Sequence, residues 1–367
     1  MAAPYRAETV GSLLRPAYLK EARSANLAGT LSAGELRSVE DRAVDEAIAL
    51  QEEIGLDVVS DGEMRRATFM AQLYETTEGV ELIPGARIHW RHPATGEEMD
   101  WNVPVTVTGT LARKRSLSAD EYAYAAARAT EPVKQALPSP LLTWGAWSPE
   151  LSRDAYPDPF DLFADATELV RQEAREVAAL GCTYIQIDAP EIPGWVDPSM
   201  GPSWEERGIA VERLLTDGLD LINAVADGIE GVTFGIHLCK GNNAGYYFAD
   251  RDYAELSRHL FGRLTRYDVF LLEYDDERSG GFEPLADCRD DAMVVLGLVS
   301  SKLAELEDPD ELAARVEAAA RYHPRDRLAL STQCGFASVM EGNPVDEAAQ
   351  RAKLRLVADV AHRLWPD

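Results

Sequence analysis

Residues 235–243 read GIHLCKGNN, an apolar run that ends in a group of polar residues. Two further runs share this pattern, VFLLEYDDERSG at residues 269–280 and LALSTQCGFAS at residues 328–338. Each begins like a buried β-strand and delivers a histidine, thiol or carboxylate where the apolar run ends. Functional residues of α/β barrels lie at the carboxyl ends of the strands. These three runs therefore indicate an α/β protein whose strand ends carry its chemistry.

The same alternation of strand-like and helical patterns extends along most of the 367-residue chain. One helical stretch places Ala43, Ala47 and Ile54 on a single face, and another begins after Asp158-Pro159. Eight strands alternating with helices favour a TIM-type (β/α)8 barrel over an open doubly wound sheet, and no G-x-G-x-x-G motif follows a strand. The expected strands are Glu8–Ser12, Leu56–Ser60, Leu141–Trp147, Thr183–Asp188, Val232–Cys239, Val269–Tyr274, Ala292–Ser300 and Arg327–Gln333.

One segment, at about residues 68–140, interrupts this alternation. It contains a predicted hairpin turn, HPATGEE at residues 92–98, between the strand-like runs RIHW and WNVPVTVTG. We expect the segment to be an excursion between the second and third strands, near the barrel mouth. With this insertion, residues 1–367 are expected to form a single catalytic barrel domain.

The composition argues against several classes of partner. The formal net charge is −27, from 63 acidic and 36 basic residues, which disfavours nucleic acid and anionic membranes. No apolar stretch approaches the length of a membrane span, and the N-terminal residues lack the apolar core of a signal peptide. Four widely spaced cysteines do not resemble a disulfide framework. A cytoplasmic location is expected, and the oligomeric state is left open.

The ends of the expected strands carry the candidate site residues. These are Ser12, Glu63, Trp147, Asp188, His237, Cys239, Glu273 and Cys334. The last four belong to residue types that commonly bind zinc, and together they predict a site for one zinc ion. Taken singly, each has a simpler explanation, because a buried cysteine is usually a small hydrophobic residue and a lone histidine is usually part of the core. Their common position at strand ends favours the metal.

A zinc site of this composition is suited to activating a thiol. A free thiol has a pKa of about 8.5, whereas a zinc-coordinated thiol is deprotonated and becomes a good nucleophile. Catalytic zinc has three protein ligands and one exchangeable position, so with four candidate ligands either one is displaced or the metal expands its coordination when substrate binds. We expect Glu273 to be the ligand that loosens, because its oxygen is the hardest donor in a sulfur-rich set.

Four further segments share the motifs of a known family. They are TVGSLLRP at 9–16, GLDVVSDGEMRR at 55–66, PVKQALPSPLLTWGAWS at 132–148 and IQIDAP at 185–190. With the HLC, LLEYDDERS and STQCG segments, they follow the motif order of the cobalamin-independent methionine synthase superfamily. The chain resembles the C-terminal catalytic barrel of that family, and in particular its short stand-alone members.

The resemblance implies a role for each candidate residue. The four predicted metal ligands would correspond to the zinc ligands of the family. Glu63 and Asp188 would bind the ammonium group of homocysteine, and Ser12 with its backbone would bind the carboxylate. Trp147 would offer a ring face to a flat donor such as a pterin.

The chain also departs from the family pattern. The H-S-P-R motif, whose histidine is linked to protonation of the leaving folate nitrogen, is replaced by LGLVSSK at residues 296–302. The D-E-P motif reads DAP at 188–190, and Gly194 stands where a later glutamate is expected, with Glu191 nearby. The chain has no room for the second, N-terminal barrel of full-length members. These departures leave thiol activation intact and favour a donor whose leaving group needs no proton.

The sequence therefore predicts a zinc-dependent thiol S-methyltransferase that converts homocysteine to methionine, with a methylfolate or a methylcorrinoid protein as donor. A first alternative is zinc-dependent alkyl transfer from an epoxide to a thiol such as coenzyme M, which would need a cation facing the sulfonate. A non-catalytic zinc- or thiol-binding barrel and a metal-free barrel of the decarboxylase type are the others. Four basic residues near strand ends could hold an anionic tail or be surface charges: Arg15, Arg65, Arg66 and Lys240.

Overall fold

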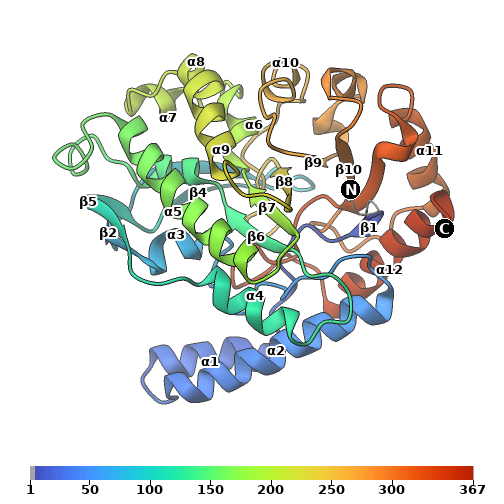
Figure 1. Ribbon diagram of the computed structural model, residues 1–367, viewed down its shortest axis with the longest axis horizontal. Helices are drawn as coiled ribbons and strands as arrows, with labels where there is room; N and C mark the ends of the chain where they lie inside the picture. The colour runs from blue at the N-terminus through green and yellow to red at the C-terminus, as the bar shows by residue number, and fades with distance from the viewer. Residues whose placement is uncertain (1–4, 367) are drawn as a thin grey trace.

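The computed structural model describes residues 5–366 and shows a parallel β-sheet curved into a barrel and surrounded by helices (Figure 1). The seven strands of the sheet follow the order β1-β11-β10-β9-β8-β7-β6, and every neighbouring pair is parallel. Their bounds are β1 Ala7–Glu8, β6 Gln135–Pro138, β7 Tyr184–Asp188, β8 Thr233–Leu238, β9 Val269–Glu273, β10 Met293–Val299 and β11 Leu328–Thr332.

Residues 57–59 close the gap between the two edges of this sheet. The amide of Asp57 donates to Ala7 O at 2.9 Å on the β1 side. On the other side, Val59 N donates to Pro132 O at 2.9 Å, and Lys134 N donates to Val59 O at 2.8 Å, just before β6. The expected strand at 56–60 is thus reduced to a single bridge, yet it completes the ring. The predicted (β/α)8 class is confirmed.

Helices cover the outside of the barrel, and α1 and α2 extend beyond it as a helical hairpin (Figure 1). Helix α2 begins with a capping box of Ser32 and Glu35 and ends at Gly55 in the left-handed conformation. Helix α5 begins at Pro159 after the Asp158 cap, as its sequence predicts. The α-helices are α1 Ala17–Leu27, α2 Ala33–Ile54, α3 Ala71–Glu75, α4 Ser118–Ala126, α5 Pro159–Ala179, α6 Glu191–Trp195, α7 Gly201–Glu206, α8 Val211–Arg213, α9 Leu219–Val225, α10 Ser257–Leu260, α11 Pro309–Ala319 and α12 Glu347–Leu364.

The third strand lies elsewhere than predicted. Residues 141–147 were expected to form it, but Pro140–Ala146 form a 3-10 helix, η1, and the strand is Gln135–Pro138. The run Leu-Leu-Thr-Trp has strand-like composition. However, Pro140 occupies the first helical turn, and Ser139 Oγ accepts a hydrogen bond from Leu141 N at 3.3 Å, both of which favour a helix start.

The excursion is confirmed as an insertion, but the chain returns to the barrel with β6, before residue 140. It forms two antiparallel pairs, β2 with β5 and β3 with β4. The predicted hairpin is β3–β4, and Arg91 in β3 exchanges backbone hydrogen bonds of 2.8 and 2.9 Å with Tyr247 in the loop after β8. The bounds are β2 Thr77–Glu81, β3 Arg87–Arg91, β4 Glu98–Asn102 and β5 Thr106–Arg113.

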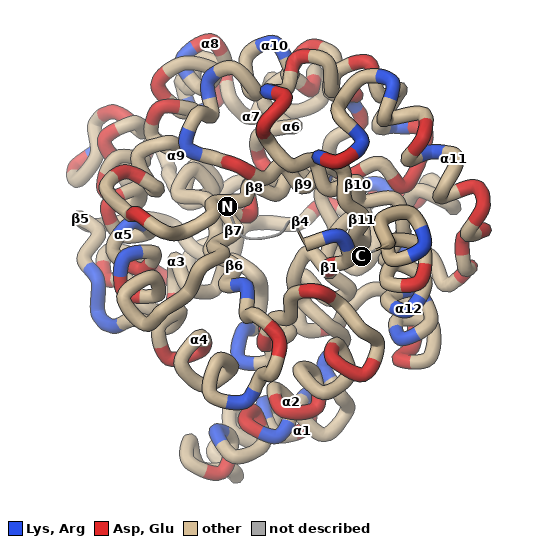
Figure 2. The backbone as a smooth tube through the Cα atoms, turned by 45° about the vertical axis from the view of Figure 1, so that its right-hand side comes forward, with Lys and Arg blue, Asp and Glu red and all other residues tan. Residues whose placement is uncertain are grey.

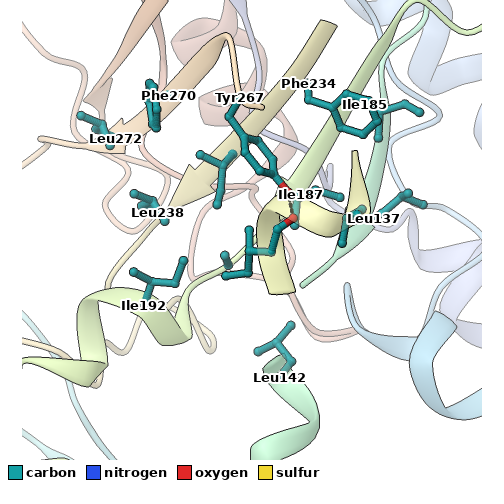
Figure 3. Close-up of a cluster of buried hydrophobic side chains, with 14 of the residues drawn as sticks. Leu137, Leu142, Ile185, Ile187, Ile192, Phe234, Leu238, Tyr267, Phe270 and Leu272 are labelled. Atoms are coloured by element: carbon teal, nitrogen blue, oxygen red, sulfur yellow. Dashed lines mark hydrogen bonds between the residues drawn. The ribbon is translucent and has the colours of Figure 1, made fainter. Parts of the chain in front are cut away.

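Alternate strand residues pack into two separate cores. Ile185 and Ile187 of β7 belong to the larger cluster, between the sheet and the helices, part of which is shown in Figure 3. Tyr184 on the same strand and Leu271 on β9 belong to a smaller cluster that draws residues from strands around the ring and fills the barrel interior. The burial of both faces explains why the strands read as continuous apolar runs.

A buried polar network crosses the base of the barrel. The Lys134 ammonium donates to the Glu8 carboxylate, to Thr9 O at 2.8 Å and to Gln186 Oε1 at 2.8 Å. Gln186 in turn donates to Val10 O at 2.8 Å. This network links β1, β6 and β7 across the closure, where the sheet itself is least regular.

Removal of the Lys134 charge should therefore destabilise the barrel. We expect Lys134→Met to lower the free energy of unfolding by about 3 kcal/mol, because Glu8 would remain buried without a partner. Arg42→Met, which breaks an exposed pair with Glu46, should change it by less than about 1 kcal/mol. Urea unfolding monitored by circular dichroism measures both, and equal losses would contradict the role assigned to the buried pair.

Acidic and basic residues are interspersed over the outer helices and loops, while the barrel strands carry few charges (Figure 2). Among residues 5–366, none of the helices is both long and apolar enough to cross a membrane.

Candidate metal and substrate site

Three of the predicted metal ligands meet at the carboxyl ends of β8 and β11. His237 lies near the end of β8, Cys239 follows that strand, and Cys334 follows β11. One donor atom from each lies within 4.8 Å of the other two, and all three side chains are buried. Neither ring nitrogen of His237 has a hydrogen-bond partner within the described part of the chain. Two thiols and a free imidazole at this spacing could hold a metal ion.

The two thiols are strongly coupled. A hydrogen bond from Cys239 lowers the pKa of Cys334 well below its usual value, and the same contact raises the pKa of Cys239 well above it. Burial alone would lower the pKa of His237, but the neighbouring Cys334 thiol and the charges of Asp188 and Glu273 together raise it. A cation bound here would stabilise the thiolate form of these cysteines.

The fourth predicted ligand, Glu273, is occupied by other partners. Its Oε1 accepts from Lys302 Nζ at 2.7 Å and from Arg278 Nη2 at 2.9 Å, and its Oε2 accepts from Lys240 N at 2.8 Å. Burial would raise the pKa of Glu273, but these cations hold it at about 2. The structure places Glu273 outside the group formed by His237 and the two thiols. Lys302 ends the segment that replaces the family's H-S-P-R motif, so that replacement supplies the partner of Glu273.

Three of the four predicted substrate residues line the same cavity as the metal group. Ser12, Glu63 and Asp188 contribute to its wall, so six of the eight predicted residues lie around one space of about 1010 Å³, including its mouth. A Cβ atom on Gly335 would lie 2.2 Å from Ser12 Oγ, and one on Gly11 would lie 2.9 Å from Glu63 Oε1. Glycine at both positions therefore allows these strand ends to approach each other.

Glu63 is held in a strained conformation. Its φ of 57° lies in the left-handed region, its amide donates to Asp61 Oδ1 at 2.8 Å, and its carbonyl accepts from Arg15 Nη2 at 2.8 Å. Burial raises the pKa of Glu63 to about 7, although the Arg66 guanidinium opposes the shift. Burial also raises the pKa of Asp188. Two buried acids with raised pKa values form a suitable site for an ammonium group.

Trp147 lies behind the cavity wall. It follows the end of η1 in extended backbone, its ring is 2% exposed, and Nε1 donates to Tyr156 O at 3.1 Å. Trp144, three residues earlier, lines the cavity. Trp144 lies within η1, whereas Trp147 follows it in extended backbone, so the helix that replaced the expected strand separates their environments.

Other aromatic residues of the cavity were not predicted. Trp90 and Trp101 come from the β3–β4 hairpin, Trp204 from α7 and Phe248 from the loop after β8. A signal for the hairpin residues does exist in the sequence. In RIHWR the apolar residues alternate with exposed charged ones, which indicates a strand with one covered face.

The basic residues near the strand ends have structural partners. Arg15 is buried and donates to backbone carbonyls, including Glu63 O and Ala337 O. Arg66 pairs with Glu121 at 2.7 Å, and Lys240 Nζ donates to Ser279 Oγ at 2.9 Å. Arg65 pairs with Asp41. They are neither surface charges nor part of the cavity wall that the structure describes.

Comparison with known proteins agrees with this geometry. The family described as cobalamin-independent synthase, catalytic domain, matches residues 6–205. The chain belongs to this family. It is 35% identical to the uncharacterized protein YxjH of Bacillus subtilis, over 99% of this chain and 95% of that protein. It is 23% identical to a methionine synthase of Sulfurisphaera tokodaii, over 89% of this chain and 84% of that one.

The family relationship extends to the three-dimensional structure. A candidate vitamin-B12 independent methionine synthase from Listeria monocytogenes aligns with a TM-score of 0.74 and 27% identity, over 100% of both chains. The family resemblance predicted from the motifs is confirmed.

One further carboxylate in the cavity belongs to a segment where this chain departs from the family motifs. Glu191 begins α6, and its Oε1 accepts from Ser139 Oγ at 2.5 Å. Its Oε2 is buried and has no hydrogen-bond partner among the residues described. Burial raises the pKa of Glu191 to about 8, and the charge of Asp188 adds to the effect.

This shift predicts a pH-dependent stability. Between the ordinary value of 4.5 and about 8, the folded protein keeps a proton on Glu191 that the unfolded chain has lost, so rising pH favours unfolding. We expect Glu191→Gln to make the substrate-free protein more stable than the wild type near pH 8 but not near pH 5. Urea unfolding at both pH values measures this. Glu173→Gln, at a buried carboxylate paired with Arg113, is the control and should have the same effect at both.

Proposed function

We propose that this chain is a zinc-dependent thiol S-methyltransferase that converts homocysteine to methionine in one catalytic barrel domain. The observation that carries the proposal is the arrangement of His237, Cys239 and Cys334 beside the acids Glu63 and Asp188 in one cavity. A family of methionine synthases supports a methyltransferase acting on homocysteine in general.

The donor set fits zinc. Two sulfurs and one imidazole nitrogen are typical of tetrahedral zinc sites, and the unpartnered His237 ring is free to coordinate. Because Glu273 is held by Lys302 and Arg278, we propose three protein ligands, with the fourth position left for the substrate thiol. Zinc bound here would keep that thiol as its nucleophilic thiolate at neutral pH.

The remaining residues would orient the amino acid. Glu63 and Asp188 would pair with its ammonium group, and the hydroxyl and amide of Ser12 would donate to its carboxylate. Charge-assisted hydrogen bonds of this kind are strong in a cavity that excludes water. Binding the amino-acid end would direct the side-chain thiol toward the metal group and convert a bimolecular step into an oriented one.

The aromatic part of the cavity would receive the methyl donor, for which a methylfolate or a methylcorrinoid protein is implied by the resemblance. The alternative of coenzyme M alkylation would require a cation beside the sulfonate. Among the described residues, the cavity wall includes carboxylates but neither lysine nor arginine. That charge favours an amino-acid acceptor over a sulfonate.

Metal content tests the ligand assignment. We expect about one zinc per chain by plasma emission after purification under reducing conditions, and loss of the metal in the Cys239→Ser/Cys334→Ser double variant. The Cys182→Ser/Cys288→Ser variant is the matched control, because these two buried cysteines lie away from the cavity and should leave zinc in place. A wild-type protein that binds no zinc even after reconstitution would refute the proposal.

Homocysteine binding tests the two acids. In the zinc-loaded protein, Asp188→Asn and Glu63→Gln should each raise the homocysteine dissociation constant about 10-fold, because each removes a charged hydrogen-bond partner of the ammonium group. Isothermal titration calorimetry measures the constants without requiring a methyl donor. Propanethiol, which has no ammonium group, should bind all three proteins equally. An unchanged homocysteine constant in both variants would assign the acids to structure alone.

A further inference from the structure

We propose that the aromatic half of the cavity binds a small sulfonium ion as the methyl donor. The inference rests on the proposed function, since it names the donor for the same acceptor thiol. It is carried by the aromatic walls, by a buried acid among them with one unpartnered oxygen, and by a described cavity wall that holds neither lysine nor arginine.

The aromatic rings are assembled around helix α6. Trp204 Nε1 donates to Gly194 O at 3.3 Å, and the Trp144 and Trp204 ring centroids are 4.2 Å apart. A Cβ atom on Gly194 would lie 3.0 Å from the Phe248 ring, which packs edge-on against Trp90 with centroids 5.1 Å apart. Indole and phenyl faces attract cations more strongly when water is excluded. The walls are therefore suited to an ion whose charge is covered by methyl groups.

Glu191 supplies an acid at this wall. It begins α6, it is 3% exposed and lines the cavity, and its Oε2 has no hydrogen-bond partner among residues 5–366. With a hydrogen bond to Oε1 alone, from Ser139, the ionised form is expensive to bury unless a cation compensates it. A sulfonium cannot donate a hydrogen bond, but it can offset this charge while its methyl groups contact the rings.

The acids of the cavity favour cationic ligands. Three acids border the cavity, Glu63, Asp188 and Glu191, and within the described chain no lysine or arginine does. The ammonium group of homocysteine would pair with Glu63 and Asp188, and a cationic donor would be stabilised by Glu191. Arg207 approaches the Trp144 ring to 5.8 Å but is not part of the wall. A donor with a carboxylate tail would find no lysine or arginine in the described wall to pair with, which costs affinity.

A sulfonium also fits the chemistry of this chain. The lone pair of the acceptor thiolate forms the new bond to the methyl carbon, the bond from that carbon to the sulfonium sulfur breaks, and its electron pair stays on the leaving sulfur. A thiolate and a cation become two neutral thioethers, so no proton is transferred. This agrees with the loss of the family's H-S-P-R histidine at residues 296–302. The neutral product also loses its attraction to the rings and to Glu191, which favours release.

Binding of non-reactive probes tests the site independently of turnover. We expect tetramethylammonium to bind the zinc-loaded protein about 10-fold more tightly than the neutral, similarly sized tert-butanol, as followed by calorimetry and tryptophan fluorescence. Glu191→Gln and Trp144→Phe should each weaken tetramethylammonium binding by about 5-fold or more. Trp147→Phe is the matched control, since that indole lies behind the wall, and should leave binding unchanged. Equal affinity for the cation and the neutral probe would overturn the inference.

Turnover separates the inference from the proposed function. With homocysteine, trimethylsulfonium should yield methionine and dimethyl sulfide in equal amounts, and Glu191→Gln should slow this reaction more than the reaction with iodomethane, a neutral donor. Methionine from iodomethane but none from trimethylsulfonium would overturn the sulfonium assignment and leave the methyltransferase standing. Methionine from neither, in a protein without zinc, would overturn the proposed function itself.

Discussion

The buried carboxylate of Glu273 is the charge around which the catalytic end of the barrel is arranged. It ends β9, accepts from the backbone after β8 through Lys240 N, and pairs with Lys302 after β10. Without Lys302 and Arg278 its desolvation would be prohibitive, since a fully buried carboxylate needs both charge and hydrogen bonds to remain ionised. Three neighbouring strand ends are thereby fixed in register, and the end of β8 presents His237 and Cys239 to the cavity.

This neutralisation also gives the cavity its uneven charge. On the side of β9 and β10, the acid is paired inside the protein by its own cations. On the side of β7 and α6, Asp188 and Glu191 have no salt bridge to a basic residue within the described part of the chain. The protein therefore pairs the buried acid on one side of the site with its own cations. On the other side, the acids are left to pair with bound ligands. The pKa values of Asp188 and Glu191 are raised for the same reason. A buried acid without a nearby cation keeps its proton, and a bound cation would favour its ionised form.

How much of this could be predicted from sequence depends on how local each feature is. The strands β7 to β11 and the placement of His237, Cys239 and Cys334 follow from apolar runs with polar ends, a pattern confined to about ten residues. The third strand was misplaced because Leu141–Trp147 has a more strand-like composition than Gln135–Pro138, and Ser139 and Pro140 decided otherwise. As a result, the aromatic contact with the donor was expected at Trp147, whereas Trp144 is the residue that lines the cavity. The partner of Glu273 could not be predicted, since Lys302 lies 29 positions along the chain and only the folded barrel brings it close.

The acceptor side and the aromatic side of the cavity are built from different parts of the chain. This difference suggests how one barrel could use the same acceptor with different methyl donors. The acceptor residues lie at strand ends, where the sheet holds them rigidly, and a metal group needs that precision. The aromatic wall is built from longer connections: Trp90 and Trp101 from the excursion, Trp204 from the segment after β7 and Phe248 from the loop after β8. The backbone bonds between Arg91 and Tyr247 tie the hairpin to the loop that follows Cys239, so both parts are positioned relative to the same thiols. Changes in these connections could alter the donor while the strand ends keep the proposed thiol-activating group intact, which is consistent with a chain that keeps His237, Cys239 and Cys334 and has LGLVSSK in place of the H-S-P-R motif.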